Sequence, residues 1–196
     1  MAVKKTKVVD KWKTKNWYGV LAPQMFENKE IAEIVASEEA KLINRIVKVS
    51  LMEATGSGSQ NAIFTILKFR ITDVKGTRAN TKLIGYEIMP TYLKTLVRRG
   101  KSLIHLSMGI KTKEDMILMI KVIAVTASRI SQNTKKNLRN ALVEEMKKST
   151  ADSTYEQLMQ EILYGRLTSK LFSRMKTITP MKRVEVRKAE LRETFK

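Results

Sequence analysis

The sequence contains few residues that could perform acid–base or nucleophilic chemistry. Its 196 residues include one histidine and no cysteine, which excludes a thiol nucleophile, a disulfide and a thiolate metal site. His105 lies in a segment of alternating hydrophobicity, with no Asp or Glu in that segment to orient it as a general base. We therefore interpret His105 as a partly exposed strand residue.

Phosphate-binding loops and metal sites are not indicated either. The run Gly56-Ser-Gly-Ser has the glycine content of a phosphate-binding loop, but no Lys-Ser or Lys-Thr follows it, and we expect a hairpin loop there. The acidic residues are scattered or gathered in residues 27–39, without the spacing of a metal site. The sequence therefore predicts a protein that is not an enzyme and that uses no cofactor or metal.

The strongest chemical signal is positive charge. Lys and Arg number 38 against 19 Asp and Glu, which gives a formal net charge of +19. This charge calls for an anionic partner, either nucleic acid, lipid or an acidic protein. A membrane is the weakest candidate, because the best amphipathic helix, at residues 131–148, has no aromatic residue. The longest apolar run is also well short of the ~20 residues of a spanning helix.

Nucleic acid fits better, because basic residues recur on many segments, as expected of a chain surrounded by phosphates. We expect phosphate contacts from the N-terminal segment, the second strand, the end of a short helix, a long basic helix and the C-terminal segment. The expected residues are Lys4, Lys5, Lys7, Lys11, Lys13, Lys15, Lys68, Arg70, Arg98, Arg99, Lys101, Arg129, Lys135, Lys136, Arg139, Arg183, Arg187 and Lys188. Arg98 and Arg99 have an alternative role, which is to complement the dipole at a helix C-terminus. Lys135, Lys136 and Arg139 could instead form a solvated helix face.

Aromatic residues are interleaved with the N-terminal lysines. Stacking of unpaired bases on such rings contributes ~1 to 3 kcal/mol for each base. Trp12, flanked by Lys11 and Lys13, is the candidate for RNA stacking. We expect Trp17, Tyr18 and Phe26 to pin the segment onto the protein's own core.

The periodicity predicts strands first and helices later. Strands are expected at residues 42–52, 62–72 and 81–88, a short helix at 91–99 after Pro90, and a strand hairpin at 102–112 and 116–126. In the second strand, the side chains expected to face the core are Ile63, Leu67, Phe69 and Ile71, and those expected to point the other way are Lys68, Arg70 and Thr72. Helices follow at residues 131–148, 155–163 and 167–175, and the alternation at 183–188 predicts a last strand. The acidic residues 27–39 are compatible with one or two helical turns.

This order of elements predicts an α+β fold with a mainly antiparallel, barrel-like sheet and C-terminal helices. We expect residues 1–26 to form an extended basic arm and residues 27–196 to form a single α+β RNA-binding domain.

Several short sequence motifs, and the order in which they occur, resemble those of one protein family. They are WY at 17–18, APQMF at 22–26, FRITDVKG at 69–76, YLKTLVRR at 92–99, SQ at 131–132 and RVEVRK at 183–188. Together they look like the archaeal small-subunit ribosomal protein family called S-three-Ae, across essentially the whole chain. The sequence departs from that family's usual residues at Asn44 and near Asp115, where a Gly is usual. It also departs at Tyr86, where a His is usual, and at Thr179, where an aromatic residue is usual.

The resemblance implies a structural ribosomal protein without catalytic activity. It implies binding to small-subunit rRNA on the platform, near the mRNA exit and beside other ribosomal proteins, with contact to mRNA as a further possibility, in the cytoplasm. A rival function is a free single-stranded RNA-binding or RNA-chaperone module, which a barrel-like sheet and Trp12 would favour.

Overall fold

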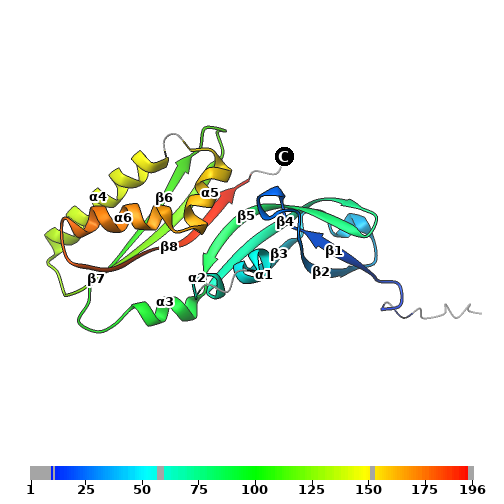
Figure 1. The fold of residues 1–196 in the computed structure, drawn as a ribbon, viewed down its shortest axis with the longest axis horizontal. Helices are drawn as coiled ribbons and strands as arrows, with labels where there is room; N and C mark the ends of the chain where they lie inside the picture. Colours follow the sequence, from blue (N-terminus) through cyan, green and yellow to red (C-terminus); the bar gives the residue numbers. More distant parts are fainter. Residues whose placement is uncertain (1–9, 11, 57–59, 151–152, 194–196) are drawn as a thin grey trace, which may run out of the picture.

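The computed structural model describes residues 10, 12–56, 60–150 and 153–193. Its strands are β1 (Asn16–Leu21), β2 (Glu30–Ala36), β3 (Ile46–Ser50), β4 (Thr65–Lys75), β5 (Arg78–Ile88), β6 (Leu103–Lys111), β7 (Ile117–Thr126) and β8 (Met181–Arg192). Its helices are α1 (Leu51–Thr55), α2 (Gln60–Ile63), α3 (Pro90–Leu96), α4 (Gln132–Thr150), α5 (Tyr155–Leu163) and α6 (Arg166–Lys176), with single 3₁₀ turns η1 (Gln24–Phe26) and η2 (Glu39–Lys41). The chain is therefore an α+β protein, as predicted (Figure 1).

One strand, β5, organises the sheet. Along one edge β5 pairs with β4, and along its other edge it pairs first with β1 and then with β8. Strands β7 and β6 continue outward from β8, and β2 continues outward from β1. Within the described residues only the β1–β5 pairing is parallel. The eight-stranded sheet therefore branches at β5 and does not close, which corrects the expectation of a barrel-like sheet.

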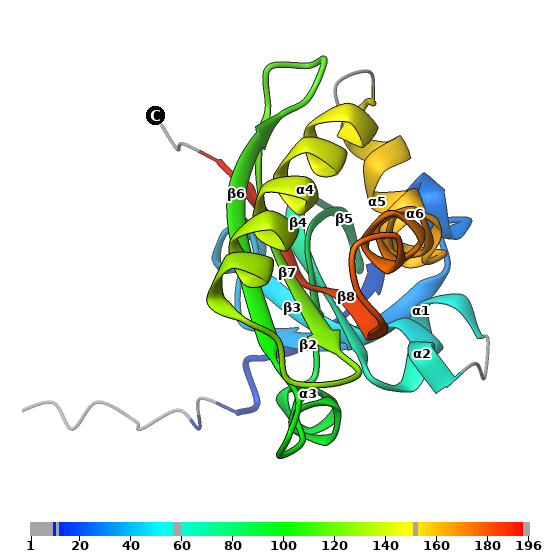
Figure 2. The same cartoon turned by 90° about the vertical axis from the view of Figure 1, so that its left-hand side faces the viewer.

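The C-terminal helices cover one face of the β6–β7–β8 branch, as Figure 2 shows. On α4 the fully buried side chains of Leu138, Leu142 and Met146 recur every four residues, so they form one stripe that joins the main core. The Tyr155 hydroxyl at the start of α5 donates a 2.8 Å hydrogen bond to the Leu83 carbonyl of β5. This bond fixes the helical layer to the central strand.

Only part of the extended arm expected at residues 1–26 can be compared with the structure, because residues 1–9 and 11 lie outside the described residues. From Asn16 onward the chain is part of the folded body, because β1 pairs with both β2 and β5. Tyr18 and Phe26 are buried, and the Phe26 ring packs edge-on against Phe69 at a centroid distance of 5.7 Å, as expected for core anchors. Trp17 is instead 62% exposed, so the prediction that it would be buried is wrong.

Two other local predictions are also wrong. The acidic residues 27–39 were compatible with one or two helical turns, but residues 30–36 form β2, and only Glu39 lies in a helical turn, η2. The connection between β3 and β4 was expected to be a simple hairpin loop, but α1 and α2 are inserted in it. Ser50 starts α1 through a reciprocal capping box with Glu53, which the sequence spells out.

Candidate nucleic-acid interface

Strands β6 and β8 begin, and β7 ends, at the same end of the β6–β7–β8 branch. The register of these strands brings basic residues that are distant in the sequence to this end of the sheet. Leu103 of β6 lies opposite Val125 of β7, which lies opposite Arg183 of β8. Thr126 is fully buried and forms two hydrogen bonds with Ser102. The Ser102 amide donates to the Thr126 hydroxyl oxygen, and the Thr126 amide donates to the Ser102 carbonyl. These bonds hold the loop before β6 against the end of β7.

We call the cationic surface at this end of the sheet the basic end. It comprises Arg98, Arg99, Lys101, Arg129, Lys182 and Arg183, which come from the loop after α3, the loop after β7 and the start of β8. All of them are exposed except Lys101, which is partly buried. The charge of Lys101, followed by those of Arg98 and Arg183, lowers the pKa of Lys182 below its ordinary value. Cations packed this closely repel one another, so the basic end favours an anionic partner.

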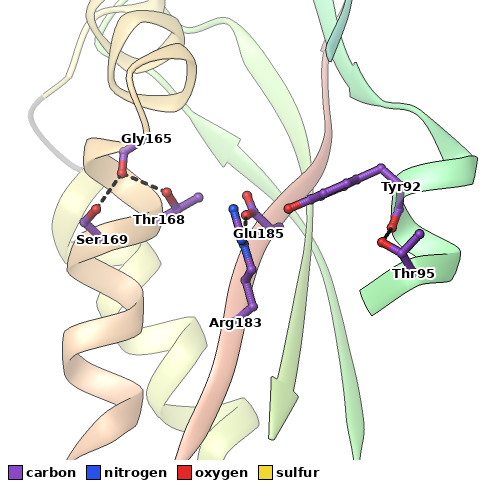
Figure 3. Close-up of polar contacts among 7 residues, drawn as sticks. All are labelled: Tyr92, Thr95, Gly165, Thr168, Ser169, Arg183 and Glu185. Carbon is purple, nitrogen blue, oxygen red and sulfur yellow. Dashed lines mark hydrogen bonds and ion pairs between the residues drawn. The ribbon is translucent and has the colours of Figure 1, made fainter. Parts of the chain in front are cut away.

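A cleft of about 510 Å³ adjoins the basic end, between α6, the start of β8 and α3. Figure 3 shows Arg183 and Glu185 side by side on β8, with Tyr92 of α3 pointing toward Glu185 from one side and Thr168 and Ser169 of α6 on the other side. The Arg183 Nε donates a 2.7 Å hydrogen bond to Glu185 Oε1, and the Arg183 guanidinium carbon lies 5.8 Å from the centroid of the Tyr92 ring. The bond to Glu185 is the largest cause of a raised Arg183 pKa. Arg183 is therefore held in place beside an aromatic ring.

A second group of predicted RNA-binding residues lies at the centre of the sheet and is paired with carboxylates. Lys68 bonds to Glu87 at 2.9 Å and to Glu190 at 2.7 Å, and Lys188 also bonds to Glu190 at 2.7 Å. Arg70 pairs with Glu193. Leu67, Phe69 and Ile71 of β4 are buried on the opposite face, as predicted, whereas Ile63 belongs to α2 and is 44% exposed, so its predicted place on the core face is wrong. Carboxylates of β5, of β8 and of Glu193, which follows β8, balance this basic stripe.

The remaining predicted residues are dispersed. Lys136 and Arg139 are exposed on α4, with Lys135 partly buried, and Arg187 is exposed at the β-bulge of β8. Lys13, Lys15 and Trp12 are exposed near the N-terminus, where the Lys15 Nζ lies 4.2 Å from the centroid of the Trp12 ring. Lys4, Lys5, Lys7 and Lys11 lie outside the described residues.

Lys182 and the aromatic wall of the cleft, formed by Phe64 and Tyr92, were not predicted from the sequence. Lys182 had one available signal, its position next to Arg183 at the start of a predicted strand. The aromatic wall had none, because Phe64 and Tyr92 are far apart in the chain and stack only after β4 and α3 are placed, with ring centroids 5.0 Å apart. Their pairing depends on the register of β4 against β5.

Other kinds of site have little support in the described part of the chain. His105 is exposed on β6. No group of His, Cys, Asp or Glu in the described residues is arranged to hold a metal ion. In the same residues no helix is long and apolar enough to cross a membrane.

Comparison with known proteins identifies the family. Residues 3–194 match the model of the Ribosomal S3Ae family. A relative from Methanobrevibacter smithii, named small ribosomal subunit protein eS1, is 35% identical over 94% of this chain and 95% of its own length. Relatives of the same name from Halorubrum lacusprofundi and Saccharolobus islandicus are 35% and 29% identical, over 90% and 97% of this chain and 81% and 91% of their own lengths. The chain therefore belongs to the Ribosomal S3Ae family, a family of structural ribosomal proteins that are not enzymes.

Proposed function

We propose that this protein is a structural component of the small ribosomal subunit that binds rRNA mainly through its basic end. In this proposal it lies on the platform near the mRNA exit, in the cytoplasm, beside other ribosomal proteins and close enough for mRNA contact. The observation that carries the proposal is the convergence of cations from three distant chain segments at one end of the sheet. Family membership adds independent support.

The physical basis is release of counterions from phosphates. Each Lys or Arg that neutralises a phosphate steepens the log–log dependence of affinity on salt by roughly 0.7 to 0.9. The cations of the basic end are mostly exposed, and strand pairing together with the Ser102–Thr126 hydrogen bonds brings their chain segments to one end of the sheet, so several of them can contact one folded RNA surface together. We expect Lys68, Arg70 and Lys188 to contribute less, because carboxylates already pair with them.

A free single-stranded RNA-binding module is the weaker alternative. One argument for it was a barrel-like sheet, and the sheet is open and branched. The other was Trp12, which is 64% exposed and associated with Lys15. A free module would bind short oligonucleotides tightly, whereas a ribosomal protein needs its folded rRNA site.

The test is the position of the protein in a sucrose gradient of cell lysate at low and at high salt. We expect wild-type protein to co-migrate with small subunits at both salt concentrations. The double variant Lys101→Gln/Lys182→Gln should be released at lower salt, because the substitutions remove two cations of the basic end. Lys41→Gln is the matched control, because it removes a cation that pairs with Glu38 at 3.0 Å outside the basic end.

Wild-type protein confined to the light fractions would contradict a ribosomal role and favour the free module. Release of the double variant at the same salt concentration as the wild type and Lys41→Gln would contradict the role of the basic end.

A further inference from the structure

The cleft beside the basic end has an aromatic wall. Phe64, which immediately precedes β4, stacks on Tyr92 of α3 with an interplanar angle of 20°. Phe172 of α6 also lines the cleft and is partly buried. Flat aromatic surfaces attract nucleobases because every base offers a π-face for stacking. The volume of about 510 Å³ lies within the roughly 300–1,000 Å³ range of small-ligand pockets.

The polar groups of the cleft suit a ligand with both donors and acceptors. The Tyr92 hydroxyl oxygen is buried and has no hydrogen-bond partner in the described part of the chain. Burial, and then the charge of Glu185, raise the pKa of Tyr92, so this group remains a neutral donor at physiological pH. Glu185, whose side chain is 16% exposed, offers carboxylate oxygens that accept hydrogen bonds. Base edges carry both kinds of partner.

The cations lie where the backbone of such a ligand would leave the cleft. Arg183 and Lys182 line the cleft themselves, and Lys101 and Arg98 lie next to Lys182. An aromatic cleft with a cationic rim matches an unstacked nucleotide, with the base inside and its phosphates at the rim. A peptide would also fill the volume, but a strongly cationic rim favours a ligand that is anionic at every repeat.

We propose that this cleft receives the base of one unpaired rRNA nucleotide, which stacks on the Phe64–Tyr92 wall while its flanking phosphates contact Lys101, Lys182 and Arg183. This proposal rests on the proposed function and adds recognition of one particular nucleotide to it. The basic end supplies affinity that depends on salt, whereas the cleft holds one splayed-out base and fixes the register of the RNA on the protein.

The first experiment is ultraviolet crosslinking of the full chain to a transcript of the small-subunit rRNA from the same organism, followed by mass spectrometry. We expect a single-nucleotide adduct on the peptide that contains Tyr92 or on the one that contains Phe172. Reconstituted small subunits, with their other proteins present, should give the same adduct.

The second experiment compares variants in the affinity for that transcript and in its salt slope. Tyr92→Leu removes the ring and should weaken binding roughly 5- to 100-fold without changing the slope, and the adduct should disappear. Tyr92→Phe keeps the ring and should keep the adduct. Ser173→Trp fills the cleft from an exposed position on α6, so it should reproduce the Tyr92→Leu result with Tyr92 still in place. Trp17→Leu is the control for removal of an exposed aromatic residue elsewhere.

The outcomes separate the two proposals. Wild-type protein that does not bind the transcript contradicts the proposed function. Salt-dependent binding that the Lys101→Gln/Lys182→Gln variant weakens, but that Tyr92→Leu and Ser173→Trp leave unchanged, overturns the cleft and preserves rRNA binding. An adduct in reconstituted subunits that joins the cleft to another protein chain also overturns the nucleotide assignment.

Discussion

Among the described residues, four that are not glycine occupy a backbone conformation that favours glycine: Glu27, Asn28, Asn44 and Asp115. Asn44 has a φ of 65° and Asp115 a φ of 55°. The resemblance implies a Gly at the position of Asn44 and another near Asp115, and at both residues this chain has the positive φ that Gly adopts most readily. Asn and Asp are the residues that tolerate this region best after Gly, because their short polar side chains bond locally. The turn at Asp115 is closed by a hydrogen bond from the Asp115 amide to the Thr112 carbonyl.

Substitution at Asp115 tests this interpretation. Asp115→Ala should lower the free energy of unfolding by about 1 kcal/mol, because alanine has no polar group to offset the left-handed conformation. Asp115→Gly should be at least as stable as the wild type. Denaturant unfolding measures both, with Glu114→Gly as the control, since Glu114 lies outside the left-handed region and should lose stability on gaining a glycine. Equal stability of Asp115→Ala and Asp115→Gly would contradict the argument.

At the scale of elements, a short seam of the sheet is reinforced by charge. The two branches meet where β5 pairs with β8 over only three residue pairs, from Gly85–Glu190 to Glu87–Lys188. Lys68 of β4 reaches across this seam and bonds to Glu87 of β5 and Glu190 of β8. An ion-pair network over a short pairing adds side-chain bonds where few backbone bonds exist.

The pH dependence of stability should reveal this network. Burial alone would raise the pKa of Glu190, but hydrogen bonds from Lys188 and Lys68 outweigh it and lower the pKa below the ordinary 4.5. The folded state therefore binds the Glu190 proton more weakly than the unfolded state does. The resulting stabilisation is complete above the unfolded-state pKa and is lost as the pH falls through the folded-state pKa.

We expect the unfolding temperature of the wild type to fall more steeply below about pH 4.5 than that of Glu190→Gln, which has no proton to gain. Thermal unfolding followed by circular dichroism, from neutral to acidic pH, measures the difference. Glu33→Gln is the matched control on the exposed strand β2 and should follow the wild-type curve. Parallel curves for wild type and Glu190→Gln would show that the network does not stabilise the seam.

At the scale of the whole molecule, helices α4, α5 and α6 lie over one face of the β6–β7–β8 branch (Figures 1 and 2). The basic end lies where β6 and β8 begin and β7 ends, and the cleft adjoins it between α6, the start of β8 and α3. On the other branch, Lys13 and Lys15 are exposed just before β1.

Deletion of residues 1–15 tests the contribution of the N-terminal segment. The deletion removes six lysines and leaves β1 intact. If these lysines neutralise phosphates, the log–log salt slope of rRNA binding should become shallower by several units, at roughly 0.7 to 0.9 for each phosphate that is no longer neutralised. Filter binding to the small-subunit rRNA transcript measures the slope. A slope equal to that of the full chain would mean that the basic end and α4 carry the electrostatic binding alone.

Much of the fold could be predicted because its signals are local. Period-two alternation predicted the pairing of β6 with β7, and helical periodicity predicted α5. Pro90 was predicted correctly at the first turn of α3, which ends at Leu96, earlier than expected. The acidic residues of β2 were misjudged because an exposed edge strand has too few buried positions to show alternation.

The sequence by itself determined the α+β class, the family, the charge and the segments that carry the cations, because each of these depends on residue type and short-range spacing. Only the tertiary structure decided which cations act together. Hydrogen bonds between Thr126 and Ser102, together with the pairing of β7 with β8, bring residues 98–101 close to residues 181–183. At the β5–β8 seam, by contrast, Lys68 and Lys188 form ion pairs with Glu190. Pairing between distant strands sets these distances, and no local pattern in a single sequence encodes it.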